Sequence, residues 1–163
     1  MPQKVLMTTG EGDSQVRYVI VGSSEMPNTS KFSYRVIALG KYDIQIGVCT
    51  VNVDIGLHNQ EKPATYQIKQ NHYRPNSACR FEEFVCNVFE AVEQFVNERE
   101  FRFCKIFGDF AYSKDITKKL GEQGFVKNGQ QLEKPILLNS IARTPIQNAY
   151  MYCILNEENE NLF

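Results

Sequence analysis

A stripe of large apolar side chains constrains the fold of this chain more than any other feature. At 100° per residue its positions share one face of an α-helix, while glutamates take much of the opposite face. Such a helix is not stable alone in water, so we expect a sheet beneath it. The stripe consists of Phe81, Phe84, Val85, Val88, Phe89, Val92, Phe95 and Val96.

A strand and a second helix are expected directly after this first helix. Residues 101–107 form an apolar run that suits a strand of the same sheet. The second helix is expected to begin at Ser113 and to end at Gly124, where a left-handed residue is favoured. Ile116 and Leu120 lie one turn apart within it. Helix, strand and helix therefore form one local unit.

The first half of the chain is predicted to be β structure. Runs rich in β-branched and aromatic residues are separated there by turn-forming residues, and residues 71–77 lead into the long helix. One run alternates as a half-buried strand should, with Ile44, Ile46 and Val48 against Gln45, Gly47 and Cys49. The predicted strands are residues 4–9, 16–21, 32–39, 44–55 and 64–70.

Two further strand signals follow the second helix. Residues 126–134 are predicted to form a hairpin that turns at Asn128 and Gly129. Residues 147–155 are predicted to be a closing strand. The acidic, amide-rich residues 156–163 are expected to form a disordered tail.

These elements predict a single α/β domain over residues 1–155, which is α+β in terms of its layers. We expect a mixed, mostly antiparallel sheet of about six to seven strands, flanked by at least two helices. A chain of 163 residues is a suitable size for one domain around one core.

Composition argues against several kinds of partner. The formal net charge is −1, so no long-range field selects nucleic acid or an anionic membrane. No apolar run approaches the roughly 20 residues that span a bilayer, and the first residues lack the features of a signal peptide. Five cysteines without a CxxC pair favour reduced thiols. We therefore expect a soluble, cytoplasmic protein.

The cysteines and histidines carry no catalytic or metal-binding signature. Cys104 and Cys153 lie in apolar strands and are expected in the core, whereas Cys86 falls on the polar face of the long helix and is expected to be exposed. Cys49 and His58 are either a nucleophile pair or a core cysteine and a solvent-facing loop histidine. Neither histidine of the chain has a second ligand at metal spacing, so no metal site is predicted.

The predicted order of elements resembles the GCN5-related N-acetyltransferase fold, with about four strands, a loop, a long helix, a strand, a short helix and two strands. Residues 106–126 contain a short helix that ends in a Gly-Phe step, and they resemble the closing half of that family. Residues 71–79 stand where the family keeps its acetyl-CoA loop. Arg74, Ser77 and Cys79 occupy the spacing of that loop.

This resemblance implies acetyl-CoA as the cofactor and acetyl transfer to an amine as the reaction. It implies that Arg74, Ser77 and Cys79 contact the pyrophosphate through their backbone. Arg80 would add positive charge beside them. Tyr112 would be the catalytic acid.

The chain departs from the family pattern in three places. Its loop has Ser77 and Cys79 where the family has glycine-like residues. Glutamates occupy the first turn of the long helix, where they compete with an anion for the helix dipole. The position of the family's usual tyrosine acid holds Leu120.

Three functions are consistent with these observations. The first is a divergent acyl-CoA N-acyltransferase. The second is a catalytically silent acetyltransferase-like scaffold that acts as a protein–protein interaction module. The third is a nucleic-acid-binding accessory protein, which would use Lys114, Lys118 and Lys119 of the short helix; those lysines otherwise form its solvated face.

Overall fold

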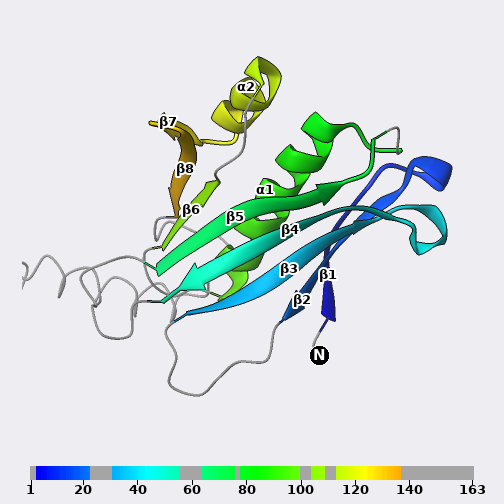
Figure 1. Cartoon of the computed structure of the whole chain (residues 1–163), viewed down its shortest axis with the longest axis horizontal. Helices are drawn as coiled ribbons and strands as arrows, with labels where there is room; N and C mark the ends of the chain where they lie inside the picture. The colour runs from blue at the N-terminus through cyan, green and yellow to red at the C-terminus, as the bar shows by residue number, and fades with distance from the viewer. Residues whose placement is uncertain are drawn as a thin grey trace, which may run out of the picture.

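Eight strands, counted over the residues that the structure describes, form one sheet with two α-helices against it (Figure 1). The computed structural model describes residues 3–22, 31–55, 64–75, 78–99, 104–108 and 113–136. The elements are β1 (Gln3–Thr9), β2 (Val16–Gly22), β3 (Lys31–Leu39), β4 (Gln45–Asp54), β5 (Ala64–Tyr73), α1 (Phe81–Arg99), β6 (Cys104–Gly108), α2 (Lys114–Glu122), β7 (Val126–Asn128) and β8 (Gln131–Ile136).

The sheet is mixed and mostly antiparallel, as predicted. β1 to β5 pair in chain order, each antiparallel to the next. β6 lies parallel to β5, because α1 carries the chain back before β6 begins. β8 lies between β6 and β7 and is antiparallel to both. The predicted count of about six to seven strands is too low, because both arms of the 126–134 hairpin join the sheet, as β7 and β8.

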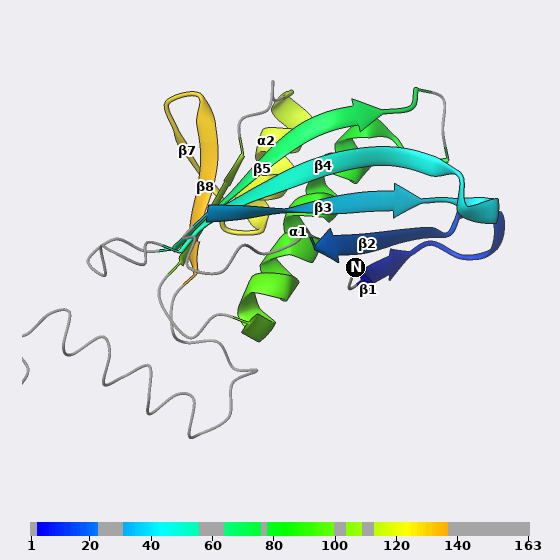
Figure 2. The ribbon, with the colours of Figure 1, turned by 60° about the horizontal axis from the view of Figure 1, so that its bottom comes forward.

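The apolar stripe forms the buried face of α1, as predicted. Phe84, Phe89 and Val92 are fully buried, whereas Glu83 and Glu90 are exposed. Figure 2 shows α1 lying across one face of the sheet. The helix is therefore held by the sheet that its stripe requires.

Local signals determine α2 and the hairpin after it. The Oγ atom of Ser113 accepts a hydrogen bond from the backbone N–H of Ile116 at 3.2 Å, which caps the helix. Gly124 has a φ of 97°, the left-handed conformation expected at the helix end. Gly129 has a φ of 63° in the turn between β7 and β8. The predictions for the short helix and the hairpin are confirmed.

The predicted alternation in β4 is wrong. Ile46, Gly47, Val48 and Cys49 are all buried, and Ile44, just before the strand, is 46% exposed. The pairing of β3 with β4 shifts by one residue here, so the two faces of β4 exchange along its length. From Cys49 onward, every second residue faces the core.

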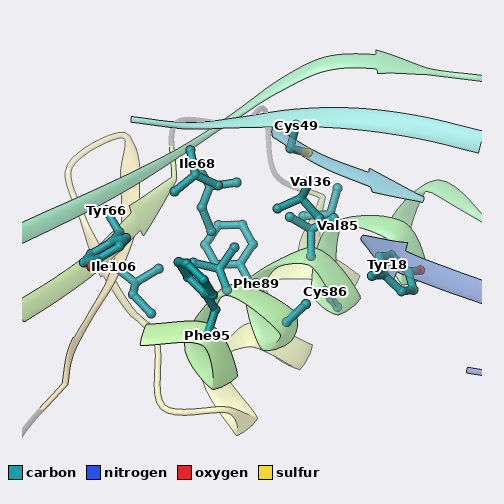
Figure 3. Packing of buried hydrophobic residues seen from close by; sticks show 14 of the residues in the cluster. Tyr18, Val36, Cys49, Tyr66, Ile68, Val85, Cys86, Phe89, Phe95 and Ile106 are labelled. Carbon is teal, nitrogen blue, oxygen red and sulfur yellow. The ribbon is translucent and has the colours of Figure 1, made fainter. Parts of the chain in front are cut away.

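Both helices pack into one core (Figures 2 and 3). In Figure 3, Val85 and Phe89 of α1 point toward Val36 of β3 and Ile68 of β5. The ring of Phe89 also meets that of Phe125 edge-on, with 4.9 Å between centroids. This contact joins α1 to the chain that leaves α2. In the described part of the chain, no helix lies against the opposite face of the sheet.

Some predictions concern residues outside the described ranges. These are the closing strand 147–155 with Cys153, the tail 156–163, and residues 101–103 before β6. Neither α1 nor α2 is both long enough and apolar enough to cross a membrane.

Candidate functional site

The sheet opens between β5 and β6, which form the one parallel pair among the described strands. Residues 64–68 of β5 pair with Cys104–Gly108 of β6. β5 then continues to Tyr73, so from Lys69 onward it has no described strand on that side. Figure 1 shows the two strands diverging. Open sheets bind ligands at the carboxyl ends of parallel strands, which makes this opening the candidate site.

β5 is longer than its sequence predicts. The sequence predicts that residues 71–73 lead into the helix, but His72 and Tyr73 pair with Val48 and Gly47 of β4. A register shift leaves Asn71 as an extra residue in this ladder. Its side-chain amide donates to the hydroxyl of the β4 threonine at position 50. Bulges of this kind redirect a strand and are common beside functional sites.

Tyr73 joins the end of β5 to the start of α1. Its ring centroid lies 5.2 Å from that of Phe81 and 5.6 Å from that of Phe84. Its hydroxyl donates a hydrogen bond to the carbonyl of Cys79 at 2.6 Å. The close packing requires a glycine at position 47, opposite Tyr73, because a Cβ atom on Gly47 would lie 2.6 Å from Cζ of Phe84.

Arg74 and Arg80, two of the predicted cofactor-binding residues, lie at this end of the sheet with exposed side chains. The backbone N–H of Arg74 donates to the carbonyl of Ile46 at 2.7 Å. The guanidinium of Arg80 lies 3.7 Å from the carboxylate of Glu82, in the first turn of the helix. Arg74 therefore continues the β4–β5 ladder through its backbone, while both guanidinium groups face solvent.

Cys79, the third predicted cofactor-binding residue, has a buried side chain that is 2% exposed. Its Sγ lies 3.6 Å from the hydroxyl of Tyr18 on β2, and that hydroxyl accepts a hydrogen bond from the side-chain amide of Asn87 on α1 at 3.0 Å. Burial raises the pKa of the Cys79 thiol and the pKa of Tyr18. The thiol is therefore protonated at neutral pH and belongs to the packing around α1.

The remaining predicted site residues, Ser77 and the catalytic acid Tyr112, lie outside the described residues. The structure thus brings Arg74, Cys79 and Arg80 together at the start of α1. It gives no position for the other two.

The other described cysteines are also buried. Cys86 is 5% exposed, so the prediction that it is exposed is wrong. Burial raises the pKa of the Cys86 thiol, and the positive charge of Lys119 on α2 opposes that rise. The helical pattern shows only the polar face of α1 and not the second helix that packs beside it. Burial raises the pKa of Cys49 to about 12, and His58, its suggested partner, lies outside the described residues. Cys104 is buried, as predicted.

Charges of both signs surround the opening. Glu82 and Glu83 lie in the first turn of α1, where the helix N–H groups carry partial positive charge. The side chains of Arg74 and Arg80 are exposed at the same end of the sheet, and the guanidinium of Arg80 partly offsets the charge of Glu82. Over the described ranges, no three His, Cys, Asp or Glu side chains gather as metal ligands.

Sequence reasoning missed Gly47, Asn71 and Tyr73. A glycine inside a strand signals a bulge or the close approach of another group, so the packing role of Gly47 could have been predicted from the sequence. Asn71 and Tyr73 carry no such signal, because their roles arise from the register of β5 against β4.

Comparison with models of known protein families and with curated proteins finds no match to this chain. Its function is therefore argued from the geometry of this opening.

Proposed function

We propose that this chain binds acyl-CoA at the opening between β5 and β6 and is a divergent N-acyltransferase. The observation that carries the proposal is the edge of β5 beyond residue 68, which has no described strand beside it. An open edge offers backbone N–H and C=O groups to an extended ligand. The pantetheine arm of coenzyme A is such a ligand, since it is extended and carries amide groups.

The order of elements around the opening supports the same proposal. Five strands, the long helix α1, β6, the short helix α2 and two closing strands follow one another along the chain. This is the order that resembles the GCN5-related N-acetyltransferases. The bulge at Asn71 and the start of α1 both lie at the end of β5 that runs beyond β6.

Arg74 and Arg80 are the groups that would attract the phosphates of the ligand. Both guanidinium groups are exposed beside the start of α1, whose first N–H groups have no partner within the helix. Glu82 and Glu83 oppose an anion at the same place. We therefore expect weak binding that decreases further with salt.

Tyr112 is the proposed acid of the reaction. The neutral acceptor amine attacks the thioester carbonyl carbon and loses a proton to water. The C–S bond breaks, the leaving thiolate takes the hydroxyl proton of Tyr112, and Tyr112 regains a proton from water. The Tyr112→Phe variant should lower kcat by about a hundredfold or more, while the Kd for acetyl-CoA is unchanged. A variant with full activity would remove Tyr112 from the mechanism.

A catalytically silent scaffold that binds a protein partner is the second candidate. One observation favours it: the backbone N–H of Arg74 already donates to the carbonyl of Ile46. The acetyl-CoA loop described above would use that N–H for the pyrophosphate. A scaffold has no such requirement.

Thermal unfolding with and without millimolar acetyl-CoA separates the two candidates. A ligand at a hundred times its Kd stabilises the folded state by about 2.7 kcal/mol, which raises Tm by several degrees. We expect a clear rise for the wild type and a smaller one for Arg80→Glu. Lys118→Glu, which makes the same charge change on the exposed face of α2, should behave as the wild type. No rise in the wild type would contradict the acyl-CoA proposal and favour the scaffold.

A further inference from the structure

We infer that Tyr73 is a positioning residue, which holds the backbone of residues 78–80 in place for the phosphate groups of the ligand. The ligand in this inference rests on the proposed acyl-CoA function, whereas the contacts of Tyr73 are features of the free protein. Tyr73 is the last residue of β5, and residues 78–80 lead directly into α1.

The carbonyl of Cys79 is held from the β5 side. The hydroxyl of Tyr73 donates to it at 2.6 Å across six positions of the chain. This bond is made to the backbone of the segment, so it restricts the peptide planes next to Cys79 directly. A short, well-directed bond of this kind adds about 1 kcal/mol to the stability of the arrangement, roughly a fivefold change in its population.

The ring of Tyr73 is itself held in place. It lies edge-on to Phe81 and tilted against Phe84, the residues that begin the buried stripe of α1. Gly47, opposite Tyr73 on β4, leaves the space that the ring of Phe84 fills beside that of Tyr73. The hydroxyl therefore has a defined position before any ligand arrives.

The side chain of Cys79 is contacted from β2, within the same core. Its thiol lies 3.6 Å from the hydroxyl of Tyr18, which Asn87 of α1 also contacts. One tyrosine from β5 thus holds the carbonyl of Cys79 and one from β2 contacts its thiol. A binding segment held in this way loses less conformational entropy when a ligand binds, which increases the affinity for the ligand.

The test compares Tyr73→Phe with two controls. Tyr73→Phe removes the hydroxyl and keeps the ring. Tyr42→Phe removes a hydroxyl from a side chain that is 83% exposed at the β3–β4 turn. Val36→Ala lowers stability in the core without touching the segment. For each protein, ¹⁵N relaxation reports the order of the backbone at Ala78, Cys79 and Arg80, and calorimetry reports the Kd for acetyl-CoA.

We expect Tyr73→Phe alone to lower the order parameters of residues 78–80, from about 0.85 toward 0.6 or below. We also expect it to weaken acetyl-CoA binding about fivefold. Unchanged order parameters, or equal changes in Val36→Ala, would overturn the inference. Lower order with an unchanged Kd would also overturn it, because the segment would then have no part in binding. If the wild type binds no acetyl-CoA, the proposed function fails together with the role assigned to Tyr73, and the relaxation data still show whether its hydroxyl orders the segment.

Discussion

Gly47 lies where β4 passes beneath the aromatic rings at the start of α1. The missing Cβ leaves room for Phe84, and the carbonyl of His72 on β5 is almost as close, at 2.9 Å from where a Cβ would lie. Neither neighbour can retreat cheaply, since Phe84 is fully buried and the carbonyl belongs to the β5 backbone. The junction of sheet and helix therefore depends on this one glycine.

The Gly47→Ala variant should lower the free energy of unfolding by about 1 to 3 kcal/mol, because the added methyl group overpacks this junction. Urea denaturation measures the loss. Gly121→Ala is the matched control, because no atom lies within 4 Å of the Cβ it would gain on the exposed face of α2. That control should gain about 0.5 to 1 kcal/mol from helix propensity. Equal stability of Gly47→Ala and the wild type would contradict the packing described here.

The residues predicted correctly from sequence are those whose environment is set by nearby sequence. Ile116 and Leu120 are buried because they share one face of a short helix. Cys86 was placed wrongly because its burial depends on α2, more than 25 positions further along the chain. Arg74 could be assigned to the opening, but the bond from its N–H to Ile46 follows from strand register and has no local signal.

At the scale of elements, α1, α2 and the β7–β8 hairpin were predictable because caps, turn glycines and apolar spacing are local features. The length of β5 was not. Residues 71–73 read as a polar lead into α1, and only the partner strand β4 makes them part of the sheet. The opening between β5 and β6 exists because of that extension, so its form could not be predicted from the sequence.

Lys134 links β8 to α1 and to the end of α2 through its side-chain ammonium group. Its Nζ lies 2.7 Å from a carboxylate oxygen of Glu93 on α1 and 2.6 Å from the carbonyl of Gln123, which follows α2. Both charged side chains are about three-quarters buried, at 24% and 25% exposure. Lys134→Met should therefore lower the free energy of unfolding by about 1 to 3 kcal/mol, measured by urea denaturation.

Lys4→Met is the control for this element-scale prediction. Lys4 pairs with Glu98 of α1 at a similar distance, 2.6 Å, but both side chains are more than half exposed. Solvent screens such a pair, and its loss should cost well under 1 kcal/mol. Equal losses in the two variants would show that burial does not distinguish these ion pairs.

At the scale of the whole molecule, the sequence predicted a mixed, mostly antiparallel sheet but not the order of its strands. β8 lies between β6 and β7, and β6 lies parallel to β5. The packing of α1 and α2 on a common core determines which strands become neighbours. The sequence of a single strand does not identify the strand that pairs with it.

The buried thiols predict how the stability of the whole molecule depends on pH. Burial raises the pKa of Cys49 to about 12, from 9.0 for a free thiol. Above pH 9 the unfolded chain loses the Cys49 proton and the folded chain keeps it, so the free energy of unfolding falls as pH rises toward 12. One such thiol contributes a slope of at most about 1.4 kcal/mol per pH unit.

The contribution of Cys49 is measured by urea denaturation between pH 7 and 11. Cys49→Ala should flatten the alkaline loss of stability relative to the wild type. Val36→Ala truncates the cross-strand neighbour of Cys49 without removing a titrating group, so it should lower stability equally at every pH. A Cys49→Ala curve parallel to that of the wild type would mean that this thiol ionises equally in both states.

The most direct test of the proposed function is to locate acetyl-CoA on the protein by amide chemical-shift mapping. The account predicts the largest shifts at residues 69–74 of the β5 edge and at residues 78–82 where α1 begins. The backbone of β1 and β2, at the far edge of the sheet, should be unaffected, and acetate alone should reproduce none of these shifts. Shifts centred on another part of the sheet, or none at millimolar acetyl-CoA, would contradict the assignment of the opening as an acyl-CoA site.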